Sequence, residues 1–92
     1  MQGTDVSTPK VEIYTKAFCG FCTRAKRLLD HKGVDYIEYD ISMGGEERDA
    51  MMARKPDAQT VPQIFIDDKS VGGSDELAAL EREGRLDPLL GL

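Results

Sequence analysis

Short stretches of alternating apolar and polar residues recur along the chain. Residues 11–14 read Val, Glu, Ile, Tyr, and this period of two predicts a β-strand. Residues 36–41 are rich in β-forming side chains and predict a second strand. Residues 63–66 and 70–71, separated by the polar segment 67–69, predict a β-hairpin.

Between the strands the spacing of apolar positions becomes helical. Apolar residues form one stripe along a helix predicted over residues 21–32, and Gly33 is typical of the position that ends such a helix. Residues 46–55 begin with acidic side chains and end with basic ones before Pro56, which predicts a second helix.

The last third of the chain predicts one further helix. Ser74 or Asp75 is expected to cap it, and it should run to residue 83 before a glycine. Asp87-Pro88 is typical of the start of a final helical turn. The predicted order is therefore β-α-β-α-β-β-α. A strand–helix–strand unit implies a parallel pair, and the hairpin adds an antiparallel edge. We expect the α/β class, with a mixed four-stranded sheet flanked by helices.

Length and charge narrow the classes of function. The 92 residues are the length of one domain, with residues 1–10 expected as an N-terminal tail and residues 11–92 as the domain. Lys and Arg number 12 against 17 Asp and Glu, and the net charge of −5 argues against nucleic-acid binding. The sequence shows neither an apolar run of roughly 20 residues nor a secretory signal pattern. We therefore expect a cytoplasmic protein without a membrane partner.

The two cysteines, Cys19 and Cys22, form a single local pair. A secreted disulfide scaffold would spread several cysteines along the chain. A structural zinc site usually needs four ligands, and His31 is the only histidine that could join the pair. A disulfide between Cys19 and Cys22 would close too small a loop to stabilise the fold much. The pair is therefore expected to have a redox or ligand-binding role.

The position of Cys19, where a loop meets the predicted helix, favours thiol chemistry. Unpaired amides of Phe21 and Cys22 should point back toward the Cys19 sulfur, and the positive end of the helix favours its thiolate. Lys16 and Arg24 add positive charge nearby. The thiolate is the attacking species in thiol–disulfide exchange. Cys22 lies about one helical turn further on and can reach back. Cys19 is therefore the expected nucleophile and Cys22 the resolving cysteine.

Four segments together resemble the dithiol glutaredoxins of the thioredoxin superfamily. They are residues 16–22 (KAFCGFC), 60–65 (TVPQIF), 72–77 (GGSDEL) and 84–90 (GRLDPLL). With the order of elements, the resemblance covers about residues 11–90 and marks residues 11–92 as a glutaredoxin domain. It implies a thioredoxin-like fold and a glutathione-dependent oxidoreductase. Such an enzyme reduces glutathione mixed disulfides and protein disulfides through Cys19 and Cys22.

The resemblance also implies a set of residues that bind glutathione. They are Lys16, Phe21, Arg48, Thr60, Val61, Pro62, Gly73, Ser74 and Asp75. Lys16 and Arg48 would attract the glycyl carboxylate, and the Val61 backbone would bind the cysteinyl unit. Pro62 would be cis and face the cysteine pair. Amides at Ser74 would hold the γ-glutamyl carboxylate, and Asp75 would pair with the γ-glutamyl ammonium.

Two departures from the family pattern leave an alternative open. Gly20-Phe21 stands where Pro-Tyr is commonest, and Gln59 stands where Arg or Thr is commoner. Family members with a small residue in place of that proline can bridge a [2Fe–2S] cluster between two chains, each giving one cysteine and one glutathione. Cys19 would be the ligand here. We otherwise expect a monomer. A thioredoxin is disfavoured, because the chain lacks the Trp that normally precedes the first cysteine of that family.

Overall fold

The structure is a computed structural model that describes residues 8–92, so most of the predicted tail over residues 1–10 lies outside the described residues. The elements are β1 (Val11–Thr15), α1 (Gly20–His31), β2 (Ile37–Asp40), α2 (Glu46–Arg54), β3 (Gln63–Ile66), β4 (Lys69–Gly72), α3 (Ser74–Arg82) and α4 (Leu86–Leu89). This confirms the predicted order, with α4 as the final turn. No described helix is long and apolar enough to cross a membrane.

The four strands form one mixed sheet in the order β2-β1-β3-β4. β1 pairs in parallel with β2, and Ile13 lies opposite Glu38. β1 pairs antiparallel with β3, and β3 antiparallel with β4, so β1 and β3 are the central strands. The predicted mixed four-stranded sheet is therefore confirmed. Because β1 is central, the loop that follows Thr15 leaves the middle of the sheet.

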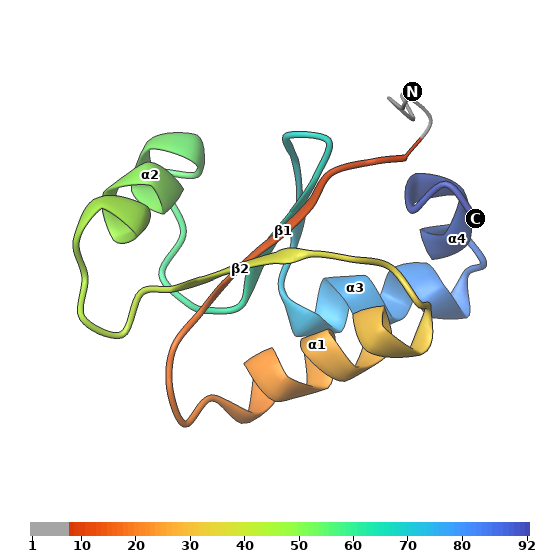
Figure 1. Ribbon diagram of the computed structural model, residues 1–92, viewed down its shortest axis with the longest axis horizontal. Helices are drawn as coiled ribbons and strands as arrows, with labels where there is room; N and C mark the ends of the chain where they lie inside the picture. Colours follow the sequence, from red (N-terminus) through yellow and green to blue (C-terminus); the bar gives the residue numbers. More distant parts are fainter. Residues whose placement is uncertain (1–7) are drawn as a thin grey trace.

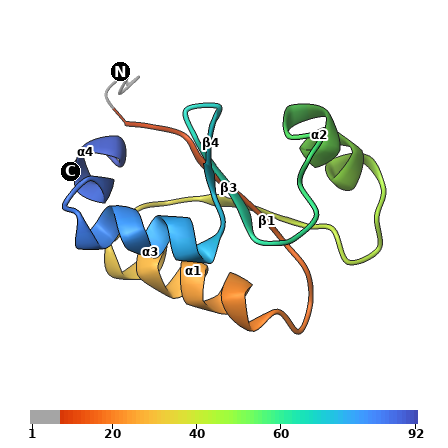
Figure 2. The same ribbon diagram turned by 180° about the vertical axis from the view of Figure 1, so that it is seen from behind.

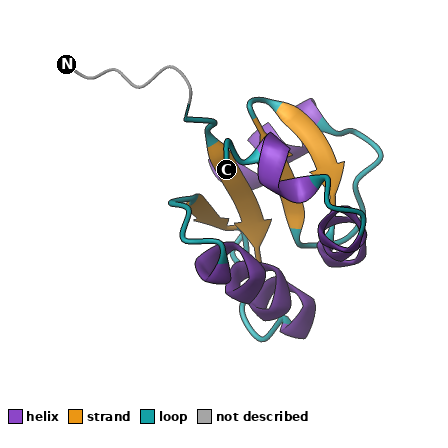
Figure 3. Cartoon of the chain, turned by 90° about the vertical axis from the view of Figure 1, so that its right-hand side faces the viewer, coloured by secondary structure: helices purple, strands orange, loops and turns teal. Residues whose placement is uncertain are grey.

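Helices cover both faces of the sheet. α1 and α3 lie side by side against one face, and α2 lies against the other (Figures 1 and 2). Viewed from the side, the strands run between these two layers (Figure 3). The core under α1 and α3 is formed by Val11, Ile13, Ala25, Leu29, Ile64, Ile66, Leu77, Leu86 and Leu90. The core under α2 is formed by Tyr14, Ile41, Met51, Ala58 and Phe65.

Glu12 is a charged residue of β1 that is nevertheless buried, with only 3% of its surface exposed. α2 covers this face of β1, and Arg54 from the end of α2 donates to Glu12 Oε1 at 2.9 Å. The Tyr39 hydroxyl donates to Glu12 Oε2 at 2.8 Å. The Arg54 guanidinium also lies 4.0 Å from the centre of the Phe65 ring. The hydrogen bond from Arg54 holds the pKa of Glu12 below its usual value. The carboxylate is therefore buried as part of an ion pair.

The start of α3 differs from the sequence prediction. Gly73, with extended backbone, is the N-cap, and its N–H donates to the Glu76 carboxylate at 2.7 Å. Ser74 is already the first helical residue and is buried, and its hydroxyl has no partner among the described residues. The prediction that Ser74 or Asp75 caps the helix is therefore wrong. Instead, the Glu76 carboxylate accepts a hydrogen bond from the Gly73 N–H. This contact pairs the backbone amide of the N-cap residue and fixes the start of the helix at Gly73.

Candidate active site

Cys19 occupies the N-cap of α1, at the end of the loop that follows β1. Its backbone is extended (φ −108°, ψ 107°), and its Sγ accepts a hydrogen bond from the Cys22 N–H at 3.1 Å. This confirms the prediction that the Cys22 amide points back toward the Cys19 sulfur. The bond pairs one of the backbone N–H groups that the first turn of a helix leaves without a partner in the helix. Phe18 just before it has a left-handed backbone (φ 58°) and a fully exposed side chain. The Cys19 sulfur thus lies at the positive end of α1 and remains partly exposed.

Cys22 lies one turn deeper and is only 2% exposed. Burial raises the pKa of the Cys22 thiol to about 12, and the hydrogen bond with Cys19 acts in the same direction. The Lys16 backbone and the charge of Lys26 act in the opposite direction. In the reduced protein at neutral pH, Cys22 is therefore a thiol. Cys22 is thus a buried thiol of raised pKa, whereas Cys19 is partly exposed, as a resolving and an attacking cysteine require.

The segment before β3 faces the cysteine pair. The Val61–Pro62 peptide bond is cis, as the family resemblance implied. The Cys19 thiol lies 3.8 Å from the Val61 carbonyl oxygen. The start of α3 packs against the same segment, and a Cβ at Gly73 would lie 3.1 Å from the Pro62 carbonyl oxygen. Glycine at position 73 therefore lets the N-terminus of α3 approach the cis proline closely.

The residues that the resemblance assigned to glutathione gather in two pockets that share Thr60 and Val61. One pocket, of about 270 Å³, is lined by Phe21, Thr60, Val61, Pro62, Gly73, Ser74, Asp75 and Glu76. The other, of about 260 Å³, includes Lys16 and Arg48. The fold thus brings together the whole predicted set, with the acidic and helix-terminal groups in one pocket and two basic groups in the other.

A third pocket, of about 400 Å³, contains residues that the sequence did not single out. It lies between the active-site loop, α1 and β2, and both cysteines line it together with Thr15, Lys26 and Glu38. The sequence does contain a signal for Lys26: it follows Cys22 by four residues, and residues at that spacing share a helix face. The contribution of Glu38 required knowledge of strand pairing.

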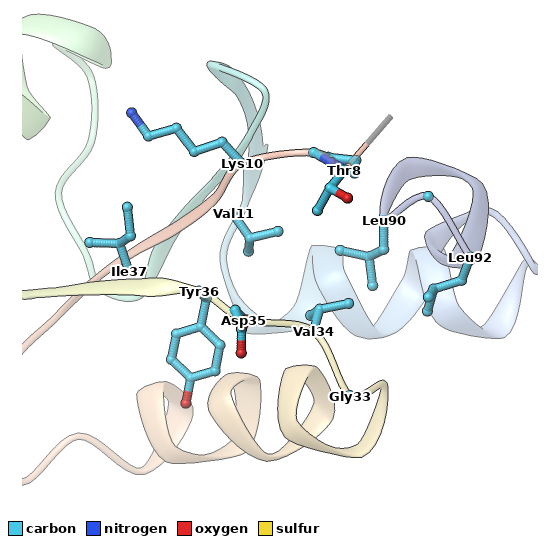
Figure 4. A pocket seen from close by; sticks show the side chains of 12 residues that line it. Thr8, Lys10, Val11, Gly33, Val34, Asp35, Tyr36, Ile37, Leu90 and Leu92 are labelled. Atoms are coloured by element: carbon cyan, nitrogen blue, oxygen red, sulfur yellow. The ribbon is translucent and has the colours of Figure 1, made fainter. Parts of the chain in front are cut away.

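A further cavity, of about 470 Å³, lies at the opposite end of β1 from the cysteines. It is formed where the residues before β1, the segment between α1 and β2, and the C-terminal residues meet (Figure 4). Apolar side chains such as Val34 and Leu90 point into it (Figure 4). It includes none of the predicted site residues.

The fold and the site together define a class of protein. A mixed sheet with helices on both faces, a helix that begins at a C-x-x-C pair and a cis proline opposite that pair characterise the thioredoxin-like thiol proteins. The glutaredoxin family model matches residues 11–71, and the chain belongs to the glutaredoxin family. Members of this family are generally oxidoreductases.

Individual relatives agree with this assignment. The chain is 54% identical over 82 residues to a glutaredoxin of Pseudomonas aeruginosa, covering 89% of this chain and 96% of the relative. The solution structure of a Brucella melitensis glutaredoxin is similar with a TM-score of 0.78 at 48% identity, covering 92% of this chain and 91% of that one. A buckwheat glutaredoxin–glutathione complex is similar with a TM-score of 0.77 at 30% identity, covering 89% and 76%.

Proposed function

We propose that this protein is a glutathione-dependent thiol–disulfide oxidoreductase of the cytoplasm. The observation that carries the proposal is the 3.1 Å hydrogen bond from the Cys22 N–H to Cys19 Sγ at the N-terminus of α1. It stabilises negative charge on a sulfur that is partly exposed and lies beside the Val61–Pro62 segment. A stabilised, accessible thiolate next to a site for a thiol-bearing peptide is what this exchange reaction requires.

The reaction begins with attack by the Cys19 thiolate on the glutathione sulfur of a mixed disulfide. A Cys19–glutathione disulfide forms, and the other sulfur leaves with the electron pair and takes up a proton. A second glutathione thiolate then attacks this disulfide, which restores Cys19 and releases oxidised glutathione. A protein disulfide is opened by the same first attack, and Cys22 completes the reduction by forming the Cys19–Cys22 disulfide.

The two pockets on either side of Val61 suit the two charged ends of glutathione. The basic Lys16 and Arg48 line one pocket and would attract the glycyl carboxylate. Ser74 and Asp75 line the other, where the N-terminus of α3 favours the γ-glutamyl carboxylate and Asp75 suits the ammonium. Similarity to the buckwheat glutaredoxin–glutathione complex supports this placement.

The proposed function is tested by glutathione-coupled reduction of a small glutathione mixed disulfide, with oxidised glutathione removed by a separate reductase. Wild-type protein should turn over many times per Cys19, at a rate that saturates with glutathione. The absorbance spectrum of the same preparation is recorded first, after anaerobic reconstitution with iron and sulfide. Absence of glutathione-dependent turnover in a colourless monomer would contradict the proposal.

Cluster carriage is the second candidate, because a Cβ at Gly20 would meet nothing within 4 Å and the loop leaves the space beside Cys19 open. Within residues 8–92, no three His, Cys, Asp or Glu side chains gather as a metal site. Cys19 is therefore the ligand that one chain would contribute, with glutathione and a second chain supplying the others. A visible spectrum together with a glutathione-dependent dimer would favour this function.

Asp75→Asn should weaken glutathione binding more than it slows the chemistry. Loss of the carboxylate removes a charged partner for the γ-glutamyl ammonium, so KM for glutathione should rise about tenfold with kcat changed little. Asp75 also lies 3.8 Å from Arg24 in an exposed ion pair. Arg24→Gln is therefore the matched control, because it breaks that pair and leaves the carboxylate. Equal increases of KM in the two variants would contradict a direct role for Asp75.

A further inference from the structure

We propose that Lys26, held in place by Glu38, is the positioning residue that activates Cys22 in the resolving step. The ammonium of Lys26 lies 3.0 Å from Glu38 Oε2, and the Thr15 hydroxyl donates to the same oxygen at 2.7 Å. These three side chains and both cysteines line one pocket of about 400 Å³. The inference rests on the proposed function, since it concerns the dithiol half of that reaction.

Three elements bring this group together. Cys22 and Lys26 are four residues apart on α1 and therefore share a helix face. Thr15 ends β1, and Glu38 lies in the neighbouring parallel strand β2. Glu38 thus reaches Thr15 on one side and Lys26 on the other. The two contacts fix the Glu38 carboxylate, and that carboxylate in turn holds the long Lys26 side chain near Cys22.

Burial makes Cys22 a poor nucleophile, so the resolving step needs help. Burial raises the pKa of Cys22, as does the hydrogen bond with Cys19. Once Cys19 has formed a mixed disulfide, its sulfur can no longer bear a negative charge. The contribution of Cys19 to the raised pKa of Cys22 is then removed. Burial then opposes ionisation of Cys22, while the Lys16 backbone and the Lys26 charge favour it. Lys26 therefore matters most at the moment when Cys22 must react.

Among the charged side chains around Cys22, Lys26 is the one suited to favour ionisation of the Cys22 thiol. Those lining the pocket besides the cysteines are Lys16, Lys26, Glu38 and Asp40. Lys16 is exposed in the active-site loop and also lines the predicted pocket for the glycyl carboxylate. On the side of α3, Arg24 is paired with Asp75. The pKa of Glu38 and that of Asp40 are both held below their usual values by hydrogen bonds, chiefly from Thr15 and Ser42 respectively, so neither carboxylate is a strong base.

The step balances without a further reagent. Cys22 loses its proton, and its thiolate attacks Cys19 Sγ of the mixed disulfide. The Cys19–Cys22 bond forms as the bond from Cys19 to the substrate sulfur breaks. That sulfur leaves with the electron pair and takes up a proton, so the substrate is reduced to a thiol and the cysteine pair is oxidised.

The test follows both cysteines in one reaction with the chromogenic disulfide dithiobis-nitrobenzoate. Cys19 attacks first and releases one coloured thiolate, and Cys22 then resolves the adduct and releases a second. In Lys26→Met we expect the second phase to slow about tenfold at neutral pH and its pH profile to move upward by about one unit. The first phase should stay within about twofold, and Lys26→Arg should restore the second.

Arg27→Met is the matched control, because Arg27 is exposed and lies about 100° further around α1. A second phase in Lys26→Met equal to that of Arg27→Met at every pH would overturn the inference. Equal slowing of both phases would also overturn it, since it would indicate a structural role. The assay contains no glutathione, so failure of glutathione-coupled turnover contradicts the proposed function alone. Cys22→Ser must show only the first phase.

Discussion

Cys19→Ser should abolish turnover of glutathione mixed disulfides, with a loss of about a thousandfold or more. The serine hydroxyl keeps the size and the position of the thiol at the N-cap of α1, but it cannot form the mixed disulfide through which the reaction runs. The measurement is glutathione-coupled reduction of a small mixed disulfide by wild type and variant. Because serine is a favourable N-cap residue, the fold should be unaffected, and circular dichroism with thermal unfolding checks this.

Cys22→Ser is the matched variant for the same assay. It should keep reduction of glutathione mixed disulfides within about threefold, because a second glutathione can resolve the Cys19 adduct. It should lose reduction of a protein disulfide, which needs the second cysteine of the pair. Incubation with oxidised glutathione should leave one glutathione on Cys19, as mass spectrometry would show. Equal loss of both activities in Cys22→Ser would contradict the division into attacking and resolving cysteines.

Arg54→Met should lower the free energy of unfolding by about 3 kcal/mol, since it removes one partner of a buried ion pair. Glu12 has a side-chain exposure of only 4%, and Arg54 donates to both of its carboxylate oxygens. The variant leaves that carboxylate with the Tyr39 hydroxyl and a 3.7 Å contact to Lys10. For a domain of this length the melting temperature should fall by roughly 15 °C. Chemical denaturation gives the free energy directly.

Two comparisons separate the ion pair from ordinary effects of losing a charge. Arg82→Met removes an exposed arginine at the end of α3 and should change stability by less than about 0.5 kcal/mol. The double variant Glu12→Leu with Arg54→Met should recover much of the loss, because it leaves no uncompensated buried charge. A single variant Arg54→Met as stable as Arg82→Met would show that the ion pair contributes little.

The same ion pair gives a dependence of stability on acid pH. The pKa of Glu12 is lowered from 4.5 in the folded protein, chiefly by the hydrogen bond from Arg54, so the folded state favours the carboxylate. A carboxyl group with a lowered pKa contributes stability above its unfolded value, and this contribution is lost as the pH falls through the folded value. Wild type should therefore lose stability below about pH 4.5 more steeply than Arg54→Met does. Parallel slopes in denaturation between pH 3 and pH 6 would contradict this linkage.

Local patterns in the sequence were sufficient for the order of elements and for the dithiol pair. The two-residue period of β1 and the helical stripe of α1 are properties of neighbouring residues, and so is the position of Cys19 immediately before a helix. The family resemblance added the cis bond before Pro62, which the structure confirms. The binding roles of the residues in the two glutathione pockets remain predictions, although the fold gathers them on both sides of Val61.

The tertiary structure decided what depends on contacts between distant segments. The alternation of β1 predicted a strand but not the burial of Glu12, which arises because α2 covers that face and brings Arg54, 42 residues away in the sequence, into contact with it. The N-cap of α3 is Gly73 and not the predicted Ser74 or Asp75, because the Glu76 side chain accepts a hydrogen bond from the Gly73 amide. Glu38 meets Lys26 only through the pairing of β2 with β1. Sequence periodicity assigns a residue to a face of its own element, whereas strand register and helix packing determine which distant side chain lies opposite it.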